Sequence, residues 1–583
     1  MMKRKNKRTM PRLYHERLNK IRAILQTAEV DAFILSVNDE FFSEYPPEHF
    51  KRLAWLTGFD GSAGTVIILA NEAAFFTDGR YTLQAQQQLD ADDYTLINSG
   101  ETSPLEWLKK NHPTLKLGID PWLISTAQFK KWQKALPDTT WQWLAPNPVD
   151  ALWEDRPALS ALPAFDYPLQ YAGKSREAKL AEISAAITAK NADSALITVP
   201  ESLAWLLNMR GRDVAHTPVM LCRALVHSDA TYELFADSAK TPAPLSASSR
   251  TIEAACANLQ GKRILIDPTQ TPLILSTLLE DSGGILMESD DPCTLPKACK
   301  NNVEADNIRN THIVDGVALT QFLHWLSTQK TLSEISAADQ LETFRKQSPD
   351  FLEPSFPSIS GFGDHGAIVH YRATPESDRN FEGNTLYLID SGGQYWGGTT
   401  DVTRTLAWGT PTAKMREHYT LVLKGHIALA QTVFPKGTAG RQLDALARQF
   451  LWQAGLDYDH GTGHGVGCCL GVHEGPQGIS KSGRDAALQT GMVLSNEPGY
   501  YLTGEYGIRI ENLVIVRESA RAGFLEFETL TCAPFDRNLV EKSLLTPTEI
   551  DWWNRYHAWI EAMLTRLLPT KCHAWLQKVC ASL

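Results

Sequence analysis

Residues 384–405 read NTLYLIDSGGQYWGGTTDVTRT, and this stretch decides the fold of the C-terminal half of the chain. Apolar residues alternate up to Asp390, as they do in a buried strand. The glycine-rich centre turns the chain, and TTDVTRT then returns as a second strand that carries Asp401. We therefore expect a hairpin in which Asp390 and Asp401 face each other across two paired strands.

A second hairpin is predicted further along the chain. NEPGYYL and GIRIENLVIV read as its two strands, and the turn between them lies at residues 503–507. The first of these segments carries Glu497 and the second carries Glu511. The two hairpins would thus contribute four carboxylates to one region of the fold.

Between the hairpins, the segment HGTGHGVGCCLGVHEGP at residues 460–476 contains His464. Four carboxylates and one imidazole make a hard, oxygen-rich ligand set, which suits Mn²⁺, Co²⁺ or Zn²⁺. A single divalent ion would leave such a site strongly negative. Two ions bridged by carboxylates would balance the charge and activate a water between them. The pattern therefore predicts a two-metal centre that performs hydrolysis.

Length and composition limit the kind of protein this is. The chain has 583 residues, too many for one hydrophobic core, so two to four domains are expected. Its net charge of −11 argues against nucleic acid or an anionic membrane as the main partner. Nine cysteines without a regular spacing indicate free thiols in a reducing compartment. No stretch has the pattern of a signal peptide or a transmembrane helix, so a cytoplasmic protein is expected.

The first half of the chain contains a faint internal repeat. DAFILSVNDEF and DSALITVPES each read as a strand and a turn, and each is followed by the tetrapeptide Leu–Ala–Trp–Leu, at residues 53–56 and 203–206. Two hydrophobic strands follow in both cases. The repeat predicts two related α/β domains, over residues 10–158 and 159–300, after a basic tail at 1–9.

From residue 301 onward the pattern changes to helices mixed with antiparallel hairpins, which predicts an α+β domain over residues 301–535. Leu319, Phe322, Leu323 and Leu326 follow the spacing of an amphipathic helix. Strands are expected at residues 366–371, 384–390, 401–408, 491–495 and 507–516. A Trp-rich helix then opens a C-terminal helical extension at 536–583, whose aromatic residues are expected to pack against the body of the protein or a partner subunit.

Taken together, these segments resemble the pita-bread (M24) metallopeptidases, and among them the three-domain Xaa-Pro aminopeptidases. The resemblance rests on GFDGSAGT, FTDGRYTLQA and LAWLLNMRG in the first half and on SFPSISGFGDHGAIVHY, GGTTDVTRT, HGTGHGVG, VHEGP, NEPGYY and GIRIEN in the second. It implies two creatinase-like α/β domains followed by a pita-bread catalytic domain. It also implies a dimeric enzyme that uses two metal ions, preferably Mn²⁺, to remove the residue before a proline at position 2 of a peptide.

The resemblance implies a role for each residue of the site. Asp401 and Glu511 would bridge the two ions, Asp390 would chelate one ion, and His464 with Glu497 would complete the other. Glu497 would also carry a proton from the bridging hydroxide to the leaving amine.

Five further residues match functional positions of the family, and His460 is a sixth candidate because it lies four residues before His464. His370 and His473 would bind the substrate backbone and stabilise the developing oxyanion. Tyr501 could donate a hydrogen bond and Arg509 could orient carboxylates. His460 could share the site if its segment is helical, and a structural role is equally open. Arg80 resembles a substrate-contacting arginine, whereas a structural pairing with Asp78 is the alternative reading.

Three alternatives remain open at this point. Prolidases share the fold and the ligand set but accept only dipeptides, so the five ligands do not discriminate. A non-catalytic peptide-binding scaffold is known in this fold but loses metal ligands, and this chain keeps all five. Creatinase-like hydrolysis without metal is disfavoured by the complete acidic set.

Overall fold

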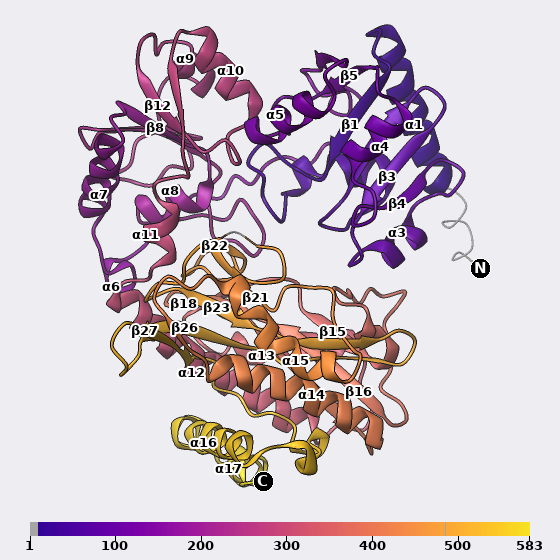
Figure 1. The fold of residues 1–583 in the computed structure, drawn as a ribbon, viewed down its shortest axis with the longest axis vertical. Coiled ribbons are helices and arrows are strands. Elements are labelled where there is room, and N and C mark those ends of the chain that lie inside the picture. Colours follow the sequence, from indigo (N-terminus) through magenta and orange to yellow (C-terminus); the bar gives the residue numbers. More distant parts are fainter. Residues whose placement is uncertain (1–9, 484) are drawn as a thin grey trace. The chain divides into compact units, whose positions relative to one another are not determined.

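The computed structural model describes residues 10–483 and 485–583, and the predicted basic tail lies outside this part of the chain (Figure 1). The chain forms two compact units. The first is built mainly from residues up to Cys293, and the second from Thr294 onward together with the short segments Pro168–Lys174 and His216–Pro218. Among the described helices, none has both the length and the apolar character needed to cross a membrane.

The first sheet of the N-terminal unit has six strands in the order β4-β3-β2-β1-β5-β6. β1 pairs antiparallel with β2 and parallel with β5. The strands are β1 (Ala32–Ser36), β2 (Thr65–Leu69), β3 (Ala73–Thr77), β4 (Thr95–Asn98), β5 (Lys116–Ile119) and β6 (Thr140–Trp143). The accompanying helices are α1 (Met10–Thr27), α2 (Arg52–Thr57), α3 (Thr82–Gln88), α4 (Pro104–Asn111) and α5 (Thr126–Ala135).

The second sheet of this unit repeats the first. Its order is β11-β10-β8-β12-β13, with β8 antiparallel to β10 and parallel to β12. Its strands are β8 (Ser194–Ile197), β10 (Arg223–His227), β11 (Tyr232–Phe235), β12 (Arg263–Ile266) and β13 (Ile285–Glu288). The helices of this part are α7 (Arg176–Ala189), α8 (Pro200–Leu206), α9 (Ile252–Cys256) and α10 (Leu273–Asp281), and β7 (Phe165–Asp166) pairs with β9 (Met209–Arg210). The short helices α6 (Leu169–Ala172) and α11 (Thr294–Ala298) belong to the second unit.

The shared tetrapeptide occupies the same place in both sheets. It lies in α2 after β1 and in α8 after β8, and two antiparallel strands follow each helix. Leu53, Leu56, Leu203 and Leu206 are buried because each of these short helices presents its apolar side to the core. The predicted pair of related α/β domains is confirmed, while the exact boundaries proposed for them remain a prediction.

The second unit combines long helices with antiparallel sheets. Its helices are α12 (Asn302–Leu326), α13 (Glu334–Arg345), α14 (Ala413–Ala430), α15 (Asp444–Gln453), α16 (Pro547–Leu564) and α17 (Thr570–Cys580). One six-stranded sheet has the order β20-β27-β26-β23-β21-β22, and smaller sheets have the orders β15-β16-β19, β14-β17-β18 and β24-β25.

The strands of the second unit are short, and four of the five predicted strands overlap them. They are β14 (Phe351–Pro354), β15 (Ile359–Phe362), β16 (Thr385–Ser391), β17 (Gly393–Tyr395), β18 (Gly398–Thr399), β19 (Val402–Trp408), β20 (Val433–Pro435), β21 (Gly463–Gly465), β22 (Glu474–Ile479), β23 (Val493–Asn496), β24 (Gly499–Leu502), β25 (Tyr506–Arg509), β26 (Asn512–Glu518) and β27 (Phe524–Thr529). The predicted strand 507–516 is divided between β25 and β26, because the chain leaves one sheet and enters another at Ile510.

The first predicted hairpin is present, with a different register from the one expected. β16 pairs antiparallel with β19, and Asp390 lies opposite Thr403. Asp401 precedes β19 by one residue, so the two aspartates are diagonal rather than direct neighbours on the same face.

The strand predicted at residues 366–371 is wrong. The segment begins with the 3₁₀ turn η3 (Gly363–Ala367), and the real strand is β15, which pairs with β16. Gly363 has a φ of +61°, which ends β15 with a left-handed turn. A Cβ atom on Gly361 would lie 2.8 Å from the backbone nitrogen of Gly366, so the chain folds back closely on itself.

The Trp-rich helix α16 packs into the core of the second unit, as expected. Trp552, Trp553 and Tyr556 lie in one buried cluster with Phe535 and Tyr419. All nine cysteines lie in the described part of the chain and are free thiols, which agrees with the prediction from their spacing.

Candidate metal centre

The five predicted ligands come from the sheets of the second unit. Asp390 lies in β16 and His464 in β21. Asp401 stands immediately before β19, Glu497 immediately after β23 and Glu511 immediately before β26. The four carboxylate residues lie at or next to the end of a strand. The regular strand pairing stops there, so the side chains can turn toward a common centre.

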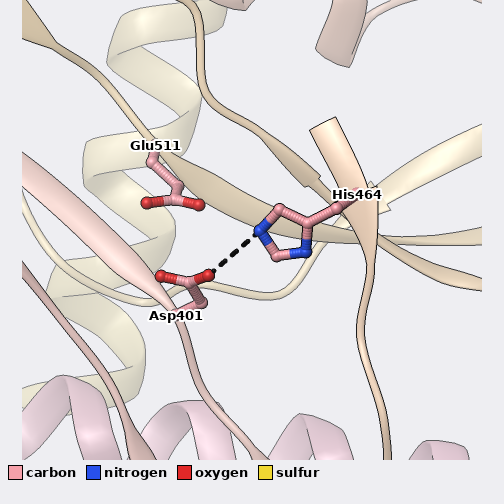
Figure 2. A group of neighbouring side chains, drawn as sticks. All are labelled: Asp401, His464 and Glu511. Carbon is pink, nitrogen blue, oxygen red and sulfur yellow. Dashed lines mark ion pairs between the residues drawn. The ribbon is translucent and has the colours of Figure 1, made fainter. Parts of the chain in front are cut away.

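Asp401, His464 and Glu511 form the tightest group (Figure 2). One ligand atom of each lies within 4.8 Å of the others. His464 Nε2 is 3.3 Å from Asp401 Oδ2 and 3.5 Å from Glu497 Oε1. The other ring nitrogen, Nδ1, donates to the carbonyl oxygen of Gly465 at 3.0 Å. This bond makes Nδ1 a donor, so Nε2, which faces the carboxylates, is the ring nitrogen that a metal would bind in place of a proton.

Polar neighbours hold the other carboxylates. Arg509 Nη2 donates to Asp390 Oδ2 at 2.6 Å. Thr403 Oγ1 donates to Glu511 Oε2 at 2.7 Å, and Ser495 Oγ donates to Glu497 Oε1 at 3.1 Å. In each case one oxygen is held by the protein, and this orients the remaining oxygen.

The electrostatics show an excess of negative charge in the centre. Burial and the neighbouring Asp401 raise the pKa of Asp390 to about 6, despite the opposing charge of Arg509. Burial also raises the pKa of Glu497 to about 7 and that of Glu511 well above its ordinary value. Although burial disfavours a charged imidazole, Asp401 and Glu497 raise the pKa of His464 to about 9. The four carboxylates thus exceed the positive charge that the protein places beside them.

Two oxygen atoms give a direct test of whether cations fit this centre. Asp390 Oδ1 and Glu511 Oε1 are buried and accept no hydrogen bond from any residue that the structure describes. A buried carboxylate oxygen without a partner is costly unless it is paired or coordinates a metal. Hard oxygen ligands with one imidazole suit divalent ions such as Mn²⁺ or Zn²⁺. The residues present therefore fit a metal centre.

A chain of hydrogen bonds runs outward from the acidic cluster. Arg509 Nη1 donates to Tyr501 Oη at 2.7 Å, and Tyr501 Oη lies 2.8 Å from His460 Nε2. His460 Nδ1 donates to the carbonyl oxygen of Gly461 at 2.8 Å, so in the neutral ring Nε2 is the acceptor and the tyrosine hydroxyl donates to it. The residues from His460 to the start of β21 form no helix, so the condition under which His460 could share the site is not met. His460 reaches Tyr501 instead.

The remaining predicted residues differ in their settings. The His473 ring stands perpendicular to that of His464, with ring centroids 4.2 Å apart. His370 is half-buried and follows Val369, whose carbonyl oxygen accepts from Arg509 Nη1 at 3.4 Å. Arg80 belongs to the other compact unit and forms two hydrogen bonds with Asp78, at 2.9 and 2.7 Å.

Sequence reasoning missed three residues that hold the ligands, namely Ser495, Thr403 and Arg404. Thr403 alternates with Asp401 along TTDVTRT, and this alternation could have indicated that both face the centre. Arg404 is almost completely buried and donates to the carbonyl oxygens of Glu511, Ala533 and Pro534 at 2.6, 2.7 and 3.0 Å. Its partners are more than 100 residues away, and no local pattern could have found them.

Comparison with protein families gives matches along nearly the whole chain. Residues 17–150 and 155–304 both match the creatinase/prolidase N-terminal domain. Residues 306–518 match metallopeptidase family M24, and residues 523–583 match the C-terminal region of that family.

Similar proteins span the same length. The chain is 38% identical over 608 residues to a probable Xaa-Pro aminopeptidase P of Laccaria bicolor, covering 97% of this chain and 93% of that protein. It is 35% identical to aminopeptidase P1 of Arabidopsis thaliana, with coverage of 97% and 98%.

Solved structures show a similar relationship. The X-prolyl aminopeptidase of Caenorhabditis elegans, described as a cytosolic enzyme with a di-nuclear active site, superposes with a TM-score of 0.93 at 32% identity, covering 98% of this chain and 100% of that one. A prolidase of Pyrococcus horikoshii shares the fold at 23% identity and a TM-score of 0.51, but it covers only 61% of this chain.

Proposed function

Because this chain belongs to the aminopeptidase P group of metallopeptidase family M24, we propose that it is a metal-dependent Xaa-Pro aminopeptidase. It removes the N-terminal residue from peptides that have proline at the second position. The observation that supports this function is the group of Asp401, His464 and Glu511, together with the buried Asp390 and Glu511 oxygens that accept no bond from the described residues, in a chain whose full length matches these aminopeptidases.

Two divalent ions, with Mn²⁺ as the preferred metal, are proposed to occupy this centre. Asp401 and Glu511 would be the ligands shared by the two ions, and one ligand atom of each lies within 4.8 Å of the other and of His464. Asp390 would hold one ion, and His464 with Glu497 would hold the other. When bound, the ions would supply Lewis acidity, which polarises a peptide carbonyl and makes water a better nucleophile.

The proposed proton carrier is Glu497. Its side chain is 17% exposed, compared with 6% for Asp401 and 11% for Asp390, so it has the widest access to a substrate among these three acids. An amide nitrogen departs only after it is protonated, and a carboxyl group at hydrogen-bond distance can deliver that proton. Glu497 would take the proton from the attacking water and pass it to the proline nitrogen.

Two histidines are proposed to bind the substrate backbone. His473 lies against His464 at the edge of the centre, and His370 follows the carbonyl that Arg509 contacts. Donors at these positions would stabilise the negative charge that develops on the carbonyl oxygen. Arg80 is proposed as a further substrate contact, and in the structure it is paired with Asp78.

Selection for proline has a physical basis. A peptide bond to proline has no N–H group to donate, and the ring fixes φ. A selective site must therefore recognise the ring by packing and the free amine by an acid such as Asp390. Prolidase activity remains the second candidate because prolidases use the same fold, but the prolidase structure leaves about two-fifths of this chain without a counterpart.

A cytoplasmic location and a homodimeric assembly are also proposed. The similar Caenorhabditis elegans enzyme is described as cytosolic, and the nine free cysteines suit a reducing compartment. Sedimentation of the purified protein would measure the assembly directly.

The test of the function is product analysis with the Mn²⁺-loaded protein on Arg-Pro-Pro, Ala-Pro and Arg-Ala-Ala, each with and without chelator. Release of arginine from Arg-Pro-Pro that exceeds cleavage of Ala-Pro, and that stops on chelation, is expected. Cleavage confined to Ala-Pro would identify a prolidase. No cleavage with Mn²⁺, Co²⁺ or Zn²⁺ would leave a peptide-binding scaffold.

A further inference from the structure

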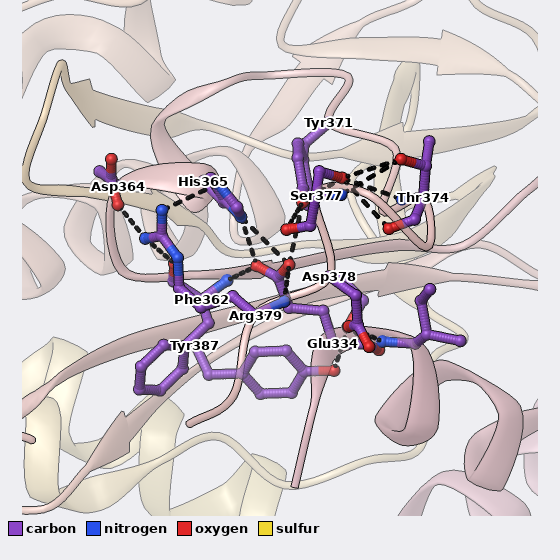
Figure 3. Close-up of polar contacts among 12 residues, drawn as sticks. Glu334, Phe362, Asp364, His365, Tyr371, Thr374, Ser377, Asp378, Arg379 and Tyr387 are labelled. Carbon is purple, nitrogen blue, oxygen red and sulfur yellow. Dashed lines mark hydrogen bonds and ion pairs between the residues drawn. The ribbon is translucent and has the colours of Figure 1, made fainter. Parts of the chain in front are cut away.

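Glu334 is a buried carboxylate far from the ligands in the sequence, and it collects donors from one long segment of the chain. It is the first residue of α13, and its side chain has no exposed surface. Figure 3 shows four donors around its two oxygens. Oε1 accepts from the Phe362 amide at 2.7 Å and from His365 Nδ1 at 2.8 Å; Oε2 accepts from the Tyr371 hydroxyl at 2.9 Å and from the Arg379 amide at 3.2 Å.

The protonation of His365 follows from its neighbours. Arg379 Nη2 lies 2.9 Å from His365 Nε2, and an arginine can only donate. Nε2 must therefore be the acceptor, and the proton lies on Nδ1, where it is donated to Glu334. The His365 and Tyr371 rings are stacked with centroids 4.4 Å apart. Glu334 thus accepts hydrogen bonds from donors whose positions are already fixed by their own neighbours.

The segment that Glu334 holds, residues 362–379, contains His370 and Val369. Tyr371, which donates to Glu334, is the residue directly after His370. The Val369 carbonyl oxygen accepts from Arg509, which also donates to Asp390. The same segment is therefore tied to Glu334 on one side and to the metal centre on the other.

Close backbone packing supports the same connection. A Cβ atom on Gly507 would lie 1.7 Å from the carbonyl oxygen of Gly366, so η3 rests directly on β25. β25 is the strand that ends with Arg509. A shift of the segment away from Glu334 would open this contact and displace His370 relative to the centre.

We propose that Glu334 is a positioning residue of the active site. It holds residues 362–379 against β25 so that His370 stays beside the metal centre. The inference rests on the proposed aminopeptidase function and on the proposed role of His370. It assigns no direct contact between Glu334 and the substrate.

The test compares Glu334→Gln with Glu549→Gln. Glu549 is a matched control because it also lies in the first turn of a helix, is buried, and accepts from Lys424 at 2.7 Å and from the Thr546 amide at 2.7 Å. A carboxylate accepts hydrogen bonds on two oxygens, whereas a neutral glutamine accepts on one oxygen and turns an NH₂ group toward the remaining donors. Both variants lose buried charge-assisted bonds, but only Glu334→Gln should disturb the segment that carries His370.

The expected result is a separation of metal binding from turnover. Glu334→Gln should bind as much Mn²⁺ as the wild type, while kcat for Arg-Pro-Pro falls about 10- to 100-fold, the order expected for a misplaced catalytic group. Glu549→Gln should keep kcat within about 3-fold under the same conditions. Amide hydrogen exchange should accelerate across residues 362–379 in Glu334→Gln alone. Tyr371→Phe removes one of the four donors, so it should lower kcat by a few-fold and serves if Glu334→Gln does not fold.

Three outcomes would overturn the inference: wild-type kcat in a folded Glu334→Gln, a loss of kcat that only accompanies a loss of metal, or unchanged exchange across residues 362–379. If the wild type itself cleaves nothing, the proposed function fails, and the exchange measurement still decides whether Glu334 positions the segment.

Discussion

Replacement of Glu497 by glutamine should make the metal-free protein more stable and the metal-loaded protein almost inactive. The substitution keeps the size of the side chain, and Ser495 Oγ can still donate to an amide oxygen. It removes one negative charge from a cluster in which burial and the neighbouring carboxylates raise the pKa of Glu497 from 4.5 to about 7. The wild type therefore pays a free-energy cost for keeping this group ionised.

The size of this cost follows from the shift. A rise of more than two pKa units corresponds to about 3 kcal/mol of destabilisation. For a raised carboxylate pKa, the cost is fully present above the folded pKa and disappears below the unfolded pKa. This shift already includes the hydrogen bond from Ser495, so no separate contribution is subtracted for that bond. The free energy of unfolding of chelator-treated Glu497→Gln should therefore exceed that of the wild type by about 3 kcal/mol at pH 8, with no gain near pH 4.5.

Urea unfolding of the metal-free proteins at both pH values measures the first effect. Steady-state cleavage of Arg-Pro-Pro at saturating Mn²⁺ measures the second, and kcat should fall about 10²- to 10⁴-fold because the proton carrier is lost. Glu541→Gln, on the exposed surface, serves as the control. If the metal-free variant is less stable than the metal-free wild type at pH 8, the buried negative charge of Glu497 does not destabilise the fold and the reasoning is refuted. Turnover within about 3-fold of the wild type would remove Glu497 from the mechanism.

Three other predictions follow from buried contacts. Lys300→Met should lower the free energy of unfolding by about 2–3 kcal/mol in urea titrations, because it removes a buried ion-pair partner of Glu474. Lys300 donates to the Val466 carbonyl oxygen at 2.7 Å and to Glu474 at 2.8 Å. An unchanged urea midpoint would contradict this prediction. Arg509→Lys should weaken Mn²⁺ binding and lower kcat by at least about 10-fold, because a single ammonium group cannot replace the guanidinium fork; wild-type values in both assays would refute it. Burial lowers the pKa of His557 to about 4, so the unfolded chain binds a proton at this residue at a higher pH than the folded protein does. The free energy of unfolding should therefore fall by about 3 kcal/mol between pH 6.5 and 4. A His557→Asn variant whose stability has the same pH slope as that of the wild type would exclude His557 as the cause.

The parts of the fold that the sequence predicts are those with a local signal. The repeated Leu–Ala–Trp–Leu helix and the strands after it are short-range patterns, and both halves fold as expected. The two hairpins carrying the acids were likewise readable from alternation and glycine. The register of β16 and β19 was not, because the hairpin between them contains the small pair β17–β18, which shifts Asp390 opposite Thr403.

Long-range partners account for most of what the sequence could not predict. The segment 366–371 is a short apolar run like that of a buried strand, but contacts with Glu334 and Gly507 hold it in a turn. Lys300 and Glu474 are 174 residues apart and form a buried ion pair without any motif. Such contacts depend on tertiary packing, which decides between local alternatives that are similar in free energy.

The burial of Arg404 has a consequence for the timing of biosynthesis. The five candidate ligands have all been translated once residue 511 is made, but Arg404 also needs the carbonyl oxygens of Ala533 and Pro534, and Tyr556 of α16 contacts its guanidinium at 3.3 Å. Domains emerge and fold from the N-terminus first. The two α/β domains can therefore fold on the ribosome, whereas the acidic pocket can close only after α16 has emerged. A nascent chain that lacks this helix would carry every metal ligand and still have no finished centre in which to hold an ion.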